Sequence, residues 1–178
     1  IRNTNMILSY TKILGLPVAE IKEQQKVGII TDTIFNYEEL SVAGIITVRN
    51  LFSRFQPPLA VTSSDILKAT KEVVLVSEPG SMTRIKELPR LYHLSEIGCI
   101  GVGQKVISES GERMGKVYDV LFEAETLAIT RIYTKDFISE RIITANNILR
   151  YEDKTIVVSG KNKKAVSAIP AIAEITPS

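Results

Sequence analysis

Residues 28–35 are Gly28-Ile-Ile-Thr-Asp32-Thr-Ile-Phe35, and 87 positions later the chain has Gly115-Lys-Val-Tyr-Asp119-Val-Leu-Phe122. The same register, extended without a gap, aligns residues 28–48 with residues 115–135 and gives seven identities in 21 positions. The identical pairs are Gly28 and Gly115, Asp32 and Asp119, Phe35 and Phe122, Glu38 and Glu125, Leu40 and Leu127, Ile45 and Ile132, and Thr47 and Thr134. Self-similarity at one fixed spacing indicates a tandem duplication.

The repeat continues on both sides of this stretch. Upstream, Gly15-Leu-Pro-Val18 corresponds to Gly103-Gln-Lys-Val106. Downstream the spacing becomes 82, and Val74-Leu-Val-Ser77 corresponds to Ile156-Val-Val-Ser159. Pro and Gly residues near positions 79, 80 and 89 punctuate the boundary between the copies. We therefore expect a first domain over residues 1–82, a linker over 83–90, a second domain over 91–161 and a C-terminal tail over 162–178.

The composition favours β-structure. Ile, Val and Thr contribute 24, 15 and 14 of the 178 residues, and β-branched side chains pack well in strands. In the second copy, the β-rich runs cover residues 105–108, 113–122, 127–134, 141–144, 148–151 and 155–159. Six short strands at this spacing predict a small closed barrel, because closure removes the unpaired sheet edges. The predicted fold is mainly β, with two tandem small β-barrels.

The motifs of the repeat resemble those of the PRC-barrel family. They consist of Gly-x-x-Val, a turn, Gly-x-Val-x-Asp-Val-x-Phe, a further strand, and Ile-Leu before a closing Val-rich strand. The resemblance rests on Gly103, Val106, Gly111, Gly115, Val117, Asp119, Val120 and Ile148 in the second copy, and on Gly15, Val18, Gly28 and Asp32 in the first. In the first copy, Gln24-Gln25 replaces the family's usual Gly-containing turn. The resemblance implies two PRC-like barrels that cover nearly the whole chain.

Two branches of this family differ from the chain in ways that bear on function. The family takes its name from the cytoplasmic part of the H subunit of the photosynthetic reaction centre, which also has a membrane helix. It includes the C-terminal half of bacterial ribosome-maturation factors, whose N-terminal half carries a His-Gly-x-x-Gly signature. Residues 1–88 contain no such signature and repeat the second half instead. The resemblance implies an architecture and no particular reaction.

Charge and hydropathy exclude several classes of protein. Lys and Arg number 22 against 20 Asp and Glu, so the chain lacks the strong basic excess typical of nucleic-acid packaging proteins. The longest stretch without a charged residue is Phe55–Ser64, too short for a membrane-spanning helix. Cys99 is the single cysteine, and no Asn-x-Ser/Thr acceptor occurs. These features are typical of a reducing compartment, and we expect a cytoplasmic protein.

Two constellations invite a catalytic interpretation. Gly98-Cys-Ile-Gly-Val-Gly103-Gln-Lys105 is close to a phosphate-binding loop, but it lacks the terminal Ser/Thr, and a strand rather than a helix is predicted to follow. His93 and Cys99 could form a nucleophile pair, although no orienting group is evident. The chain offers too few His and Cys for a typical zinc site. We predict no catalytic residue, no metal and no cofactor.

The repeated Gly and Asp residues have a structural interpretation. Asp32 and Asp119 follow Gly28 and Gly115 at the same interval, where a carboxylate can accept hydrogen bonds from turn amides and fix the hairpin register. We expect both glycines to lie where a strand bends or where backbones approach closely. Gly15 and Gly103 belong to the same structural motif.

Two segments mix cations with aromatic side chains and are candidates for partner binding. Their candidate residues are Arg49, Phe52, Arg54 and Phe55 in the first copy, and Arg131, Tyr133 and Phe137 in the second. For Phe52 and Phe55 we favour burial against a barrel. The alternatives are a protein-binding patch or an RNA-binding surface, because aromatics beside Arg stack on unpaired bases.

We therefore interpret the chain as a non-enzymatic interaction or assembly module with a protein partner. Arg54 and the two phenylalanines beside it are the candidate anchors. Two alternatives stay open: an RNA- or ribosome-associated protein, and a carrier of a small ligand in the crevice between the barrels.

Overall fold

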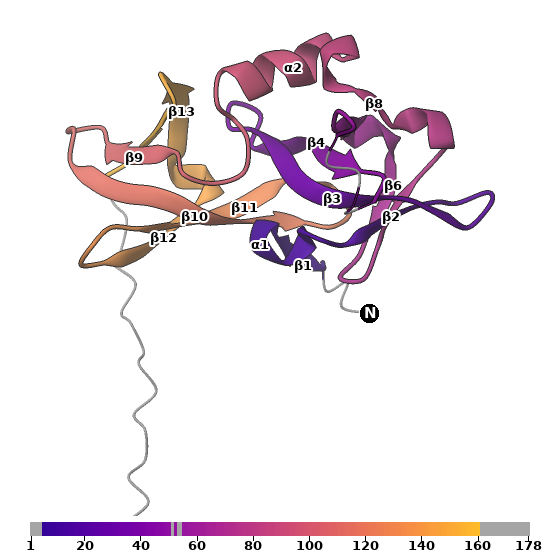
Figure 1. Ribbon diagram of the computed structural model, residues 1–178. Coiled ribbons are helices and arrows are strands. Elements are labelled where there is room, and N and C mark those ends of the chain that lie inside the picture. The colour runs from indigo at the N-terminus through magenta and orange to yellow at the C-terminus, as the bar shows by residue number, and fades with distance from the viewer. Residues whose placement is uncertain (1–4, 51, 53–54, 161–178) are drawn as a thin grey trace, which may run out of the picture.

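The two longest strands organise the molecule. The computed structural model describes residues 5–50, 52 and 55–160. Within them, β3 (Gln25–Asn36) and β10 (Arg113–Glu123) each lie at the middle of a β-sheet and bury most of their apolar side chains. Both sheets are curled, one of them into a half-barrel (Figure 1). The mainly β fold expected from the β-branched composition is confirmed.

The first sheet contains seven strands in the order β6-β7-β2-β3-β4-β5-β8. Only the β2–β7 ladder is parallel. Besides β3, the strands are β2 (Pro17–Glu20), β4 (Ser41–Val48), β5 (Leu59–Thr62), β6 (Ile66–Ala69), β7 (Val74–Val76) and β8 (Thr83–Arg84).

The second sheet has the order β13-β14-β9-β10-β11-β12, with β1 added on the free side of β10. The strands besides β10 are β1 (Ile7–Ser9), β9 (Lys105–Ser108), β11 (Ile129–Lys135), β12 (Glu140–Thr144), β13 (Ile148–Glu152) and β14 (Thr155–Val158). This order is the order of the first sheet from β6 to β5, and its β9–β14 ladder is likewise the parallel one. Neither series of ladders returns to its first strand within the described residues, so closed barrels are not confirmed.

Short helices connect and cover the sheets. They are α1 (Tyr10–Ile13), α2 (Pro89–Glu96), and the 3-10 helices η1 (Ser63–Asp65), η2 (Pro79–Ser81), η3 (Ile85–Glu87) and η4 (Ala145–Asn147). The helix α2 has Pro89 in its first turn and buries Leu91 and Leu94. Leu91 lies so close to Gly44 of β4 that a Cβ atom there would be 2.9 Å from its Cδ1 atom. The predicted linker, residues 83–90, thus contains β8, η3 and the start of α2.

The two halves exchange segments across the centre of the molecule. The strand β1 pairs with β10, which belongs to the second copy. Conversely, the segment before β9 pairs with β3: the amide of Phe35 donates to the carbonyl oxygen of Cys99 at 2.9 Å, and that of Gly101 to Thr33 at 2.9 Å. Each half therefore contributes a short segment that pairs with the longest strand of the other half.

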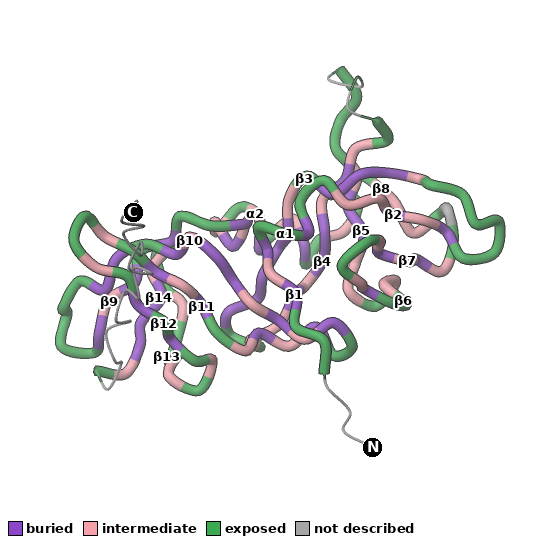
Figure 2. Tube along the Cα trace, turned by 90° about the horizontal axis from the view of Figure 1, so that it is seen from below, coloured by how far each residue is buried: buried purple, intermediate pink, exposed green. Residues whose placement is uncertain are grey.

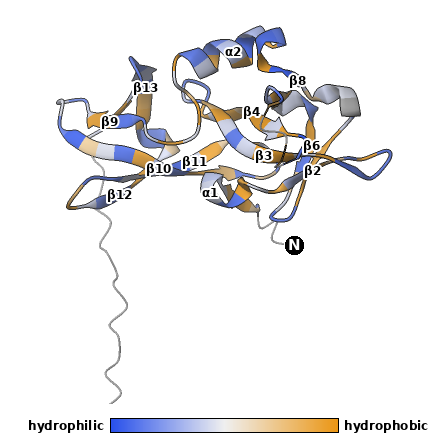
Figure 3. Ribbon diagram, in the orientation of Figure 1, coloured by the Kyte–Doolittle hydropathy of each residue, from blue (hydrophilic) through white to orange (hydrophobic). Residues whose placement is uncertain are grey.

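One aromatic cluster joins the halves. The rings of Phe35 and Phe122, which are equivalent in the repeat, lie with centroids 6.4 Å apart, and both side chains are buried. Tyr10 and Tyr37 pack against Phe35 at 6.0 and 6.1 Å. Buried positions run from one sheet through this region to the other (Figure 2). Apolar residues recur along the strands, whereas α2 is largely hydrophilic (Figure 3). The two sheets thus share one hydrophobic core.

Candidate partner-binding surface

The connection between β4 and β5 carries the first group of candidate residues. Phe52 and Phe55 are almost fully exposed, at 94% and 101%. The amide of Phe52 donates to the Asn50 side-chain oxygen at 3.0 Å, which fixes a local turn. The expected burial of these two rings is wrong, because the connection projects away from the sheets (Figure 2). Arg54 lies outside the described residues.

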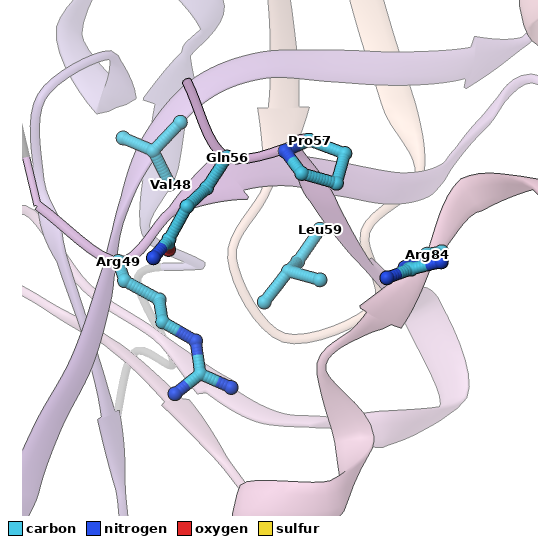
Figure 4. Close-up of a pocket in the computed structure, with 6 residues that line it drawn as sticks. All are labelled: Val48, Arg49, Gln56, Pro57, Leu59 and Arg84. Carbon is cyan, nitrogen blue, oxygen red and sulfur yellow. The ribbon is translucent and has the colours of Figure 1, made fainter. Parts of the chain in front are cut away.

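A pocket of about 380 Å³ lies at the base of this connection (Figure 4). Its lining residues are Val48, Arg49, Gln56, Pro57, Leu59 and Arg84. Arg49 and Arg84 stand on opposite sides of it, with the Leu59 side chain between them (Figure 4). Both arginines are exposed, and no described carboxylate lies within 4.0 Å of either guanidinium. The pocket combines the apolar Leu59 side chain with two cations that no described carboxylate neutralises, and a guanidinium can bind an anionic group.

Sequence reasoning missed Arg84, which falls in the predicted linker. Its place in the pocket depends on the pairing of β8 with β5, in which Arg84 lies opposite Leu59. A two-residue strand leaves no recognisable pattern in a sequence, and a linker gives no reason to expect pairing with the domain before it. The remaining sequence indication of a strand here is the dipeptide Thr83-Arg84 after the turn residues Pro79-Gly80, and this indication is weak.

The equivalent connection in the second half joins β11 to β12 and also presents apolar side chains. Phe137 and Ile138 are almost fully exposed. Asp136 shapes this turn, because its Oδ1 atom accepts hydrogen bonds from the amides of Ile138 and Ser139, both at 2.8 Å. Those amide bonds hold the pKa of the Asp136 carboxyl below its usual range. Both halves thus expose aromatic side chains at the same place in the strand order.

Arg131 and Tyr133 lie on one face of β11. Phe137 lies in the turn between β11 and β12. Tyr133 packs against Tyr118 of β10, with ring centroids 6.0 Å apart. The Lys135 ammonium lies over the Tyr118 ring, 5.2 Å from its centroid. The second-half candidates therefore lie on β11 of the second sheet and in the turn after it, whereas Arg49, Phe52 and Phe55 lie in the β4–β5 connection of the first sheet.

Asp32 and Asp119 both bind the N-terminal segment. The Asp119 carboxylate accepts hydrogen bonds from the Ser9 hydroxyl at 2.9 Å, and from the amide and hydroxyl of Thr11 at 3.1 and 3.0 Å. Asp32 accepts one from the Tyr10 hydroxyl at 3.1 Å. Each also accepts a hydrogen bond from the amide of the residue that follows it. Burial raises the pKa of the Asp32 carboxyl above its usual value. These acids act on the N-terminal segment rather than on hairpin turns.

The repeated glycines lie at close approaches. A Cβ atom on Gly28 would be 3.1 Å from the Val48 carbonyl oxygen, and one on Gly115 would be 2.6 Å from that of Lys135. Gly15 and Gly103 both have a left-handed backbone, with φ of +83° and +106°. The expected close backbone approach is confirmed for Gly28 and Gly115.

A second pocket, of about 290 Å³, lies where the halves meet and contains the possible nucleophile pair. His93 and Cys99 both line it, beside Tyr37 and Tyr151. Burial raises the pKa of the Cys99 thiol to about 11, so the reactive thiolate is scarce near neutral pH. Both tyrosine hydroxyls are already engaged, one with Gln104 and one with the carbonyl oxygen of Ile97. The two tyrosine hydroxyls of this pocket are therefore already used within the protein.

The glycine-rich segment over residues 98–105 does not form a phosphate cradle. The strand β9 follows it, and the amides of Gly101 and Gly103 donate to the carbonyl oxygens of Thr33 and Val117. Those two amides are therefore unavailable to a phosphate. In the part of the chain that the structure describes, no cluster of three His, Cys, Asp or Glu side chains could hold a metal ion.

Comparison with known proteins does not identify a family for this chain. No protein-family model matches the chain, and no curated protein matches it significantly. Over residues 5–50, 52 and 55–160, no helix has the length and apolar character needed to cross a membrane.

Proposed function

We propose that the chain is a non-enzymatic interaction module built from two PRC-like units duplicated in tandem, and that it binds a protein partner through the β4–β5 connection. The observation that carries this proposal is the nearly complete exposure of Phe52 and Phe55 on a connection that also lines a pocket with two arginines, neither of which is paired with a described carboxylate. Isolated exposed apolar residues are common on protein surfaces, but two exposed rings on one connection whose ends also line a cationic pocket are typical of a recognition site.

The duplication is supported by topology as well as by sequence. Six strands of each sheet follow the same order, with the same single parallel ladder. The 3-10 helices η1 and η4 precede β6 and β13 at equivalent positions. The PRC-like interpretation of each unit depends on the Gly and Asp motifs together with this order. Curled sheets with one half-barrel are compatible with it.

The proposed recognition combines apolar and ionic contacts. Burying one phenylalanine ring that is otherwise exposed contributes about 1.5–3 kcal/mol, so two rings supply a substantial part of a micromolar affinity. Arg49 and Arg84 flank Leu59 in the pocket, and each can form a bidentate pair with a carboxylate. We therefore expect the partner to present apolar side chains next to Asp or Glu.

The test compares capture of partners by the wild-type chain and by variants. Phe52→Ser with Phe55→Ser, and separately Arg49→Glu with Arg84→Glu, should each reduce recovery of the same protein from native lysate at least about tenfold. Leu67→Ser, which alters a half-exposed residue on β6 of the same sheet, is the matched control and should leave recovery unchanged. Recovery that is equal for all variants, or metabolite turnover by the purified chain, would contradict the proposal.

RNA binding is a second candidate function, favoured by the Tyr118–Tyr133 pair with Lys135 above it. Aromatic rings beside cations stack on unpaired bases and bind the backbone phosphates. Affinity for single-stranded RNA should then fall steeply with salt and fall about tenfold or more in Tyr133→Leu. An affinity that is insensitive to both changes would eliminate this candidate.

A further inference from the structure

Three lysines form a row across neighbouring strands of the second sheet. Lys105 of β9 lies opposite Lys116 of β10, and Lys116 lies opposite Lys135 of β11. Residues directly opposite each other in antiparallel strands have their side chains on one face, and adjacent strands are about 4.8 Å apart. All three lysines are exposed. Like charges directly opposite each other repel, so this lysine row destabilises the ladders that contain it.

The first half shows that the fold does not require cations in this row. The repeat aligns the three lysine positions with apolar residues, and the ladders of the first sheet place these residues opposite one another in the same order. They are Pro17, Ile29 and Val48. The same strand order is therefore built with an apolar row in one half and a cationic row in the other. A repulsive feature that the architecture does not need indicates a binding function.

A pocket of about 490 Å³ lies beside one end of the lysine row. Lys154, which immediately precedes β14, adds a further cation to it, and the repeat has Glu72 at that position. The Lys154 side chain packs over Gly98, because a Cβ atom there would be 3.2 Å from the Lys154 Cγ atom. The lining residues are Ser95, Gly98, Ile100, Val102, Gly103, Gln104, Lys105, Lys116, Asp153 and Lys154.

The charges of this pocket are unbalanced. Lys105, Lys116 and Lys154 all line it, and no described carboxylate lies within 4.0 Å of their ammonium groups. Asp153 is the one acid among the lining residues. Three cations against one carboxylate favour an anionic ligand that carries more than one negative charge.

Lys135 at the far end of the row is in a different environment. It lies opposite Glu140 in the β11–β12 ladder, and its ammonium lies over the Tyr118 ring. Lys135 is not among the residues that line the pocket. The binding site therefore centres on the other two lysines of the row together with Lys154.

One wall of the pocket is fixed from within the protein. Gln104 is buried, and its Nε2 atom donates hydrogen bonds to the carbonyl oxygens of Gly98 and Ile100 at 2.8 and 3.1 Å. These bonds hold the segment that precedes β9 in one conformation. A wall that is already ordered reduces the entropy lost on binding.

We propose that this pocket binds the polyphosphate group of a small ligand, with Lys105, Lys116 and Lys154 as its contacts. This inference goes beyond the proposed function, which concerns the first sheet. None of the lining residues is aromatic, so the pocket offers no ring on which a base could stack, and the phosphates are the recognised part. Ammonium groups bind phosphate as point charges, so the site does not depend on the engaged amides of Gly101 and Gly103.

Titration calorimetry of the full chain with inorganic tripolyphosphate and with adenosine triphosphate tests the proposal. At pH 7.5 and about 50 mM salt we expect dissociation constants of about 10–300 µM that are similar for the two probes and rise with salt. Lys105→Gln with Lys116→Gln should weaken binding about tenfold or more. The matched control is Lys26→Gln with Lys68→Gln, which removes two exposed lysines of the first sheet and should leave binding unchanged.

A single substitution separates loss of binding from loss of folding. Lys116→Ile introduces the residue that the first half has at this position, and it removes the repulsion within the row. Its melting temperature should be at least that of the wild type. Tripolyphosphate should raise the melting temperature of the wild type, and should raise that of Lys116→Ile by less than half as much.

Three results would overturn the proposal. The first is that the wild type binds neither probe. The second is that Lys105→Gln with Lys116→Gln binds tripolyphosphate as tightly as the wild type. The third is binding of single-stranded RNA, but not of tripolyphosphate, through the same lysines, which would assign the row to a nucleic acid instead.

Discussion

Leu40 and Leu127 occupy equivalent positions in the two halves, and the carbonyl oxygen of each accepts a hydrogen bond from the other half. The amide of Val42 donates to Leu127 at 2.9 Å, and that of Ile129 donates to Leu40 at 2.7 Å. Both leucines have positive φ, 52° and 60°. Such reciprocal contacts are typical of an interface between identical subunits about a twofold axis. They join the halves next to the core around Phe35.

We expect the halves to unfold together because they share this core. Phe35→Ala and Phe122→Ala should each lower the free energy of unfolding by about 3–5 kcal/mol, with a coupling of about 0.5–1.5 kcal/mol in the double variant. Chemical denaturation followed by circular dichroism measures both quantities. Phe137→Ala, at an exposed ring, should change stability by less than about 0.5 kcal/mol. Two separate transitions in the wild type would contradict a shared core.

Asp119 should hold the N-terminal segment on the second sheet. Asp119→Ala leaves the Thr11 amide and two hydroxyls without their acceptor, so we expect a loss of about 1–3 kcal/mol. Hydrogen exchange should accelerate at the Thr11 amide. Asp65→Ala is the control, because the Asp65 carboxylate accepts a bond from the hydroxyl of Thr62 at a more exposed site. Equal effects of the two substitutions would argue against this role of Asp119.

Alanine substitutions at Gly115 and Gly111 distinguish two causes of destabilisation: a strained backbone conformation and a steric clash of the added Cβ atom. Both have positive φ, +95° and +83°, so alanine strains either position. A Cβ atom on Gly115 would meet the Lys135 carbonyl oxygen at 2.6 Å, whereas none of the described atoms lies within 4 Å of one on Gly111. Gly115→Ala should therefore be about 1–3 kcal/mol more destabilising than Gly111→Ala. Thermal denaturation of the two variants compares them directly, and equal melting temperatures would refute the steric explanation.

Stability should fall at alkaline pH. Burial raises the pKa of Cys99 to about 11, and burial also raises the pKa of Tyr10, Tyr37 and Tyr151 above its usual range. In the unfolded chain these groups lose their protons near pH 8.5 for Cys and about 10 for Tyr. From about pH 8.5 upward the unfolded state therefore binds fewer protons than the folded state, so the free energy of unfolding decreases as pH rises.

Denaturant titrations at pH 7.5, 9 and 10.5 measure this dependence. The free energy of unfolding should be flat near pH 7.5 and should then decrease through pH 9 and 10.5. Cys99→Val removes the thiol ionisation and should reduce the decrease without abolishing it, because the tyrosines remain. An increase in stability over this interval would contradict the assigned burial.

The strands were predictable because their signal is local. Alternating apolar residues bounded by turn residues predicted residues 105–108 and 113–122, where the structure has β9 and β10 with nearly the same bounds. The helix α2 has only eight residues, and its buried face consists of two leucines, Leu91 and Leu94. Two apolar positions are too few to show a helical period in the sequence. The start of α2 at Pro89 was interpreted as a boundary signal.

What joins the halves could not be predicted from the sequence. Pairing of β1 with β10 connects residues more than a hundred positions apart, and a three-residue strand has no periodicity of its own. The exposure of Phe52 and Phe55 was also missed, because burial is the usual state of an aromatic ring and the sequence does not show that their loop projects. The candidate cations Arg49 and Arg131 were recognisable from composition, but Arg84 required the β5–β8 pairing.

The exchange of segments constrains how the chain folds on the ribosome. Synthesis proceeds from the N-terminus, so β3 emerges long before residues 99–101, which pair with it. β1 emerges before β10, its partner, and cannot pair until β10 has been synthesised. The nascent first half therefore keeps apolar surface uncovered until β10 and the segment before β9 have left the exit tunnel. During that interval the uncovered apolar surface favours aggregation of the nascent chain.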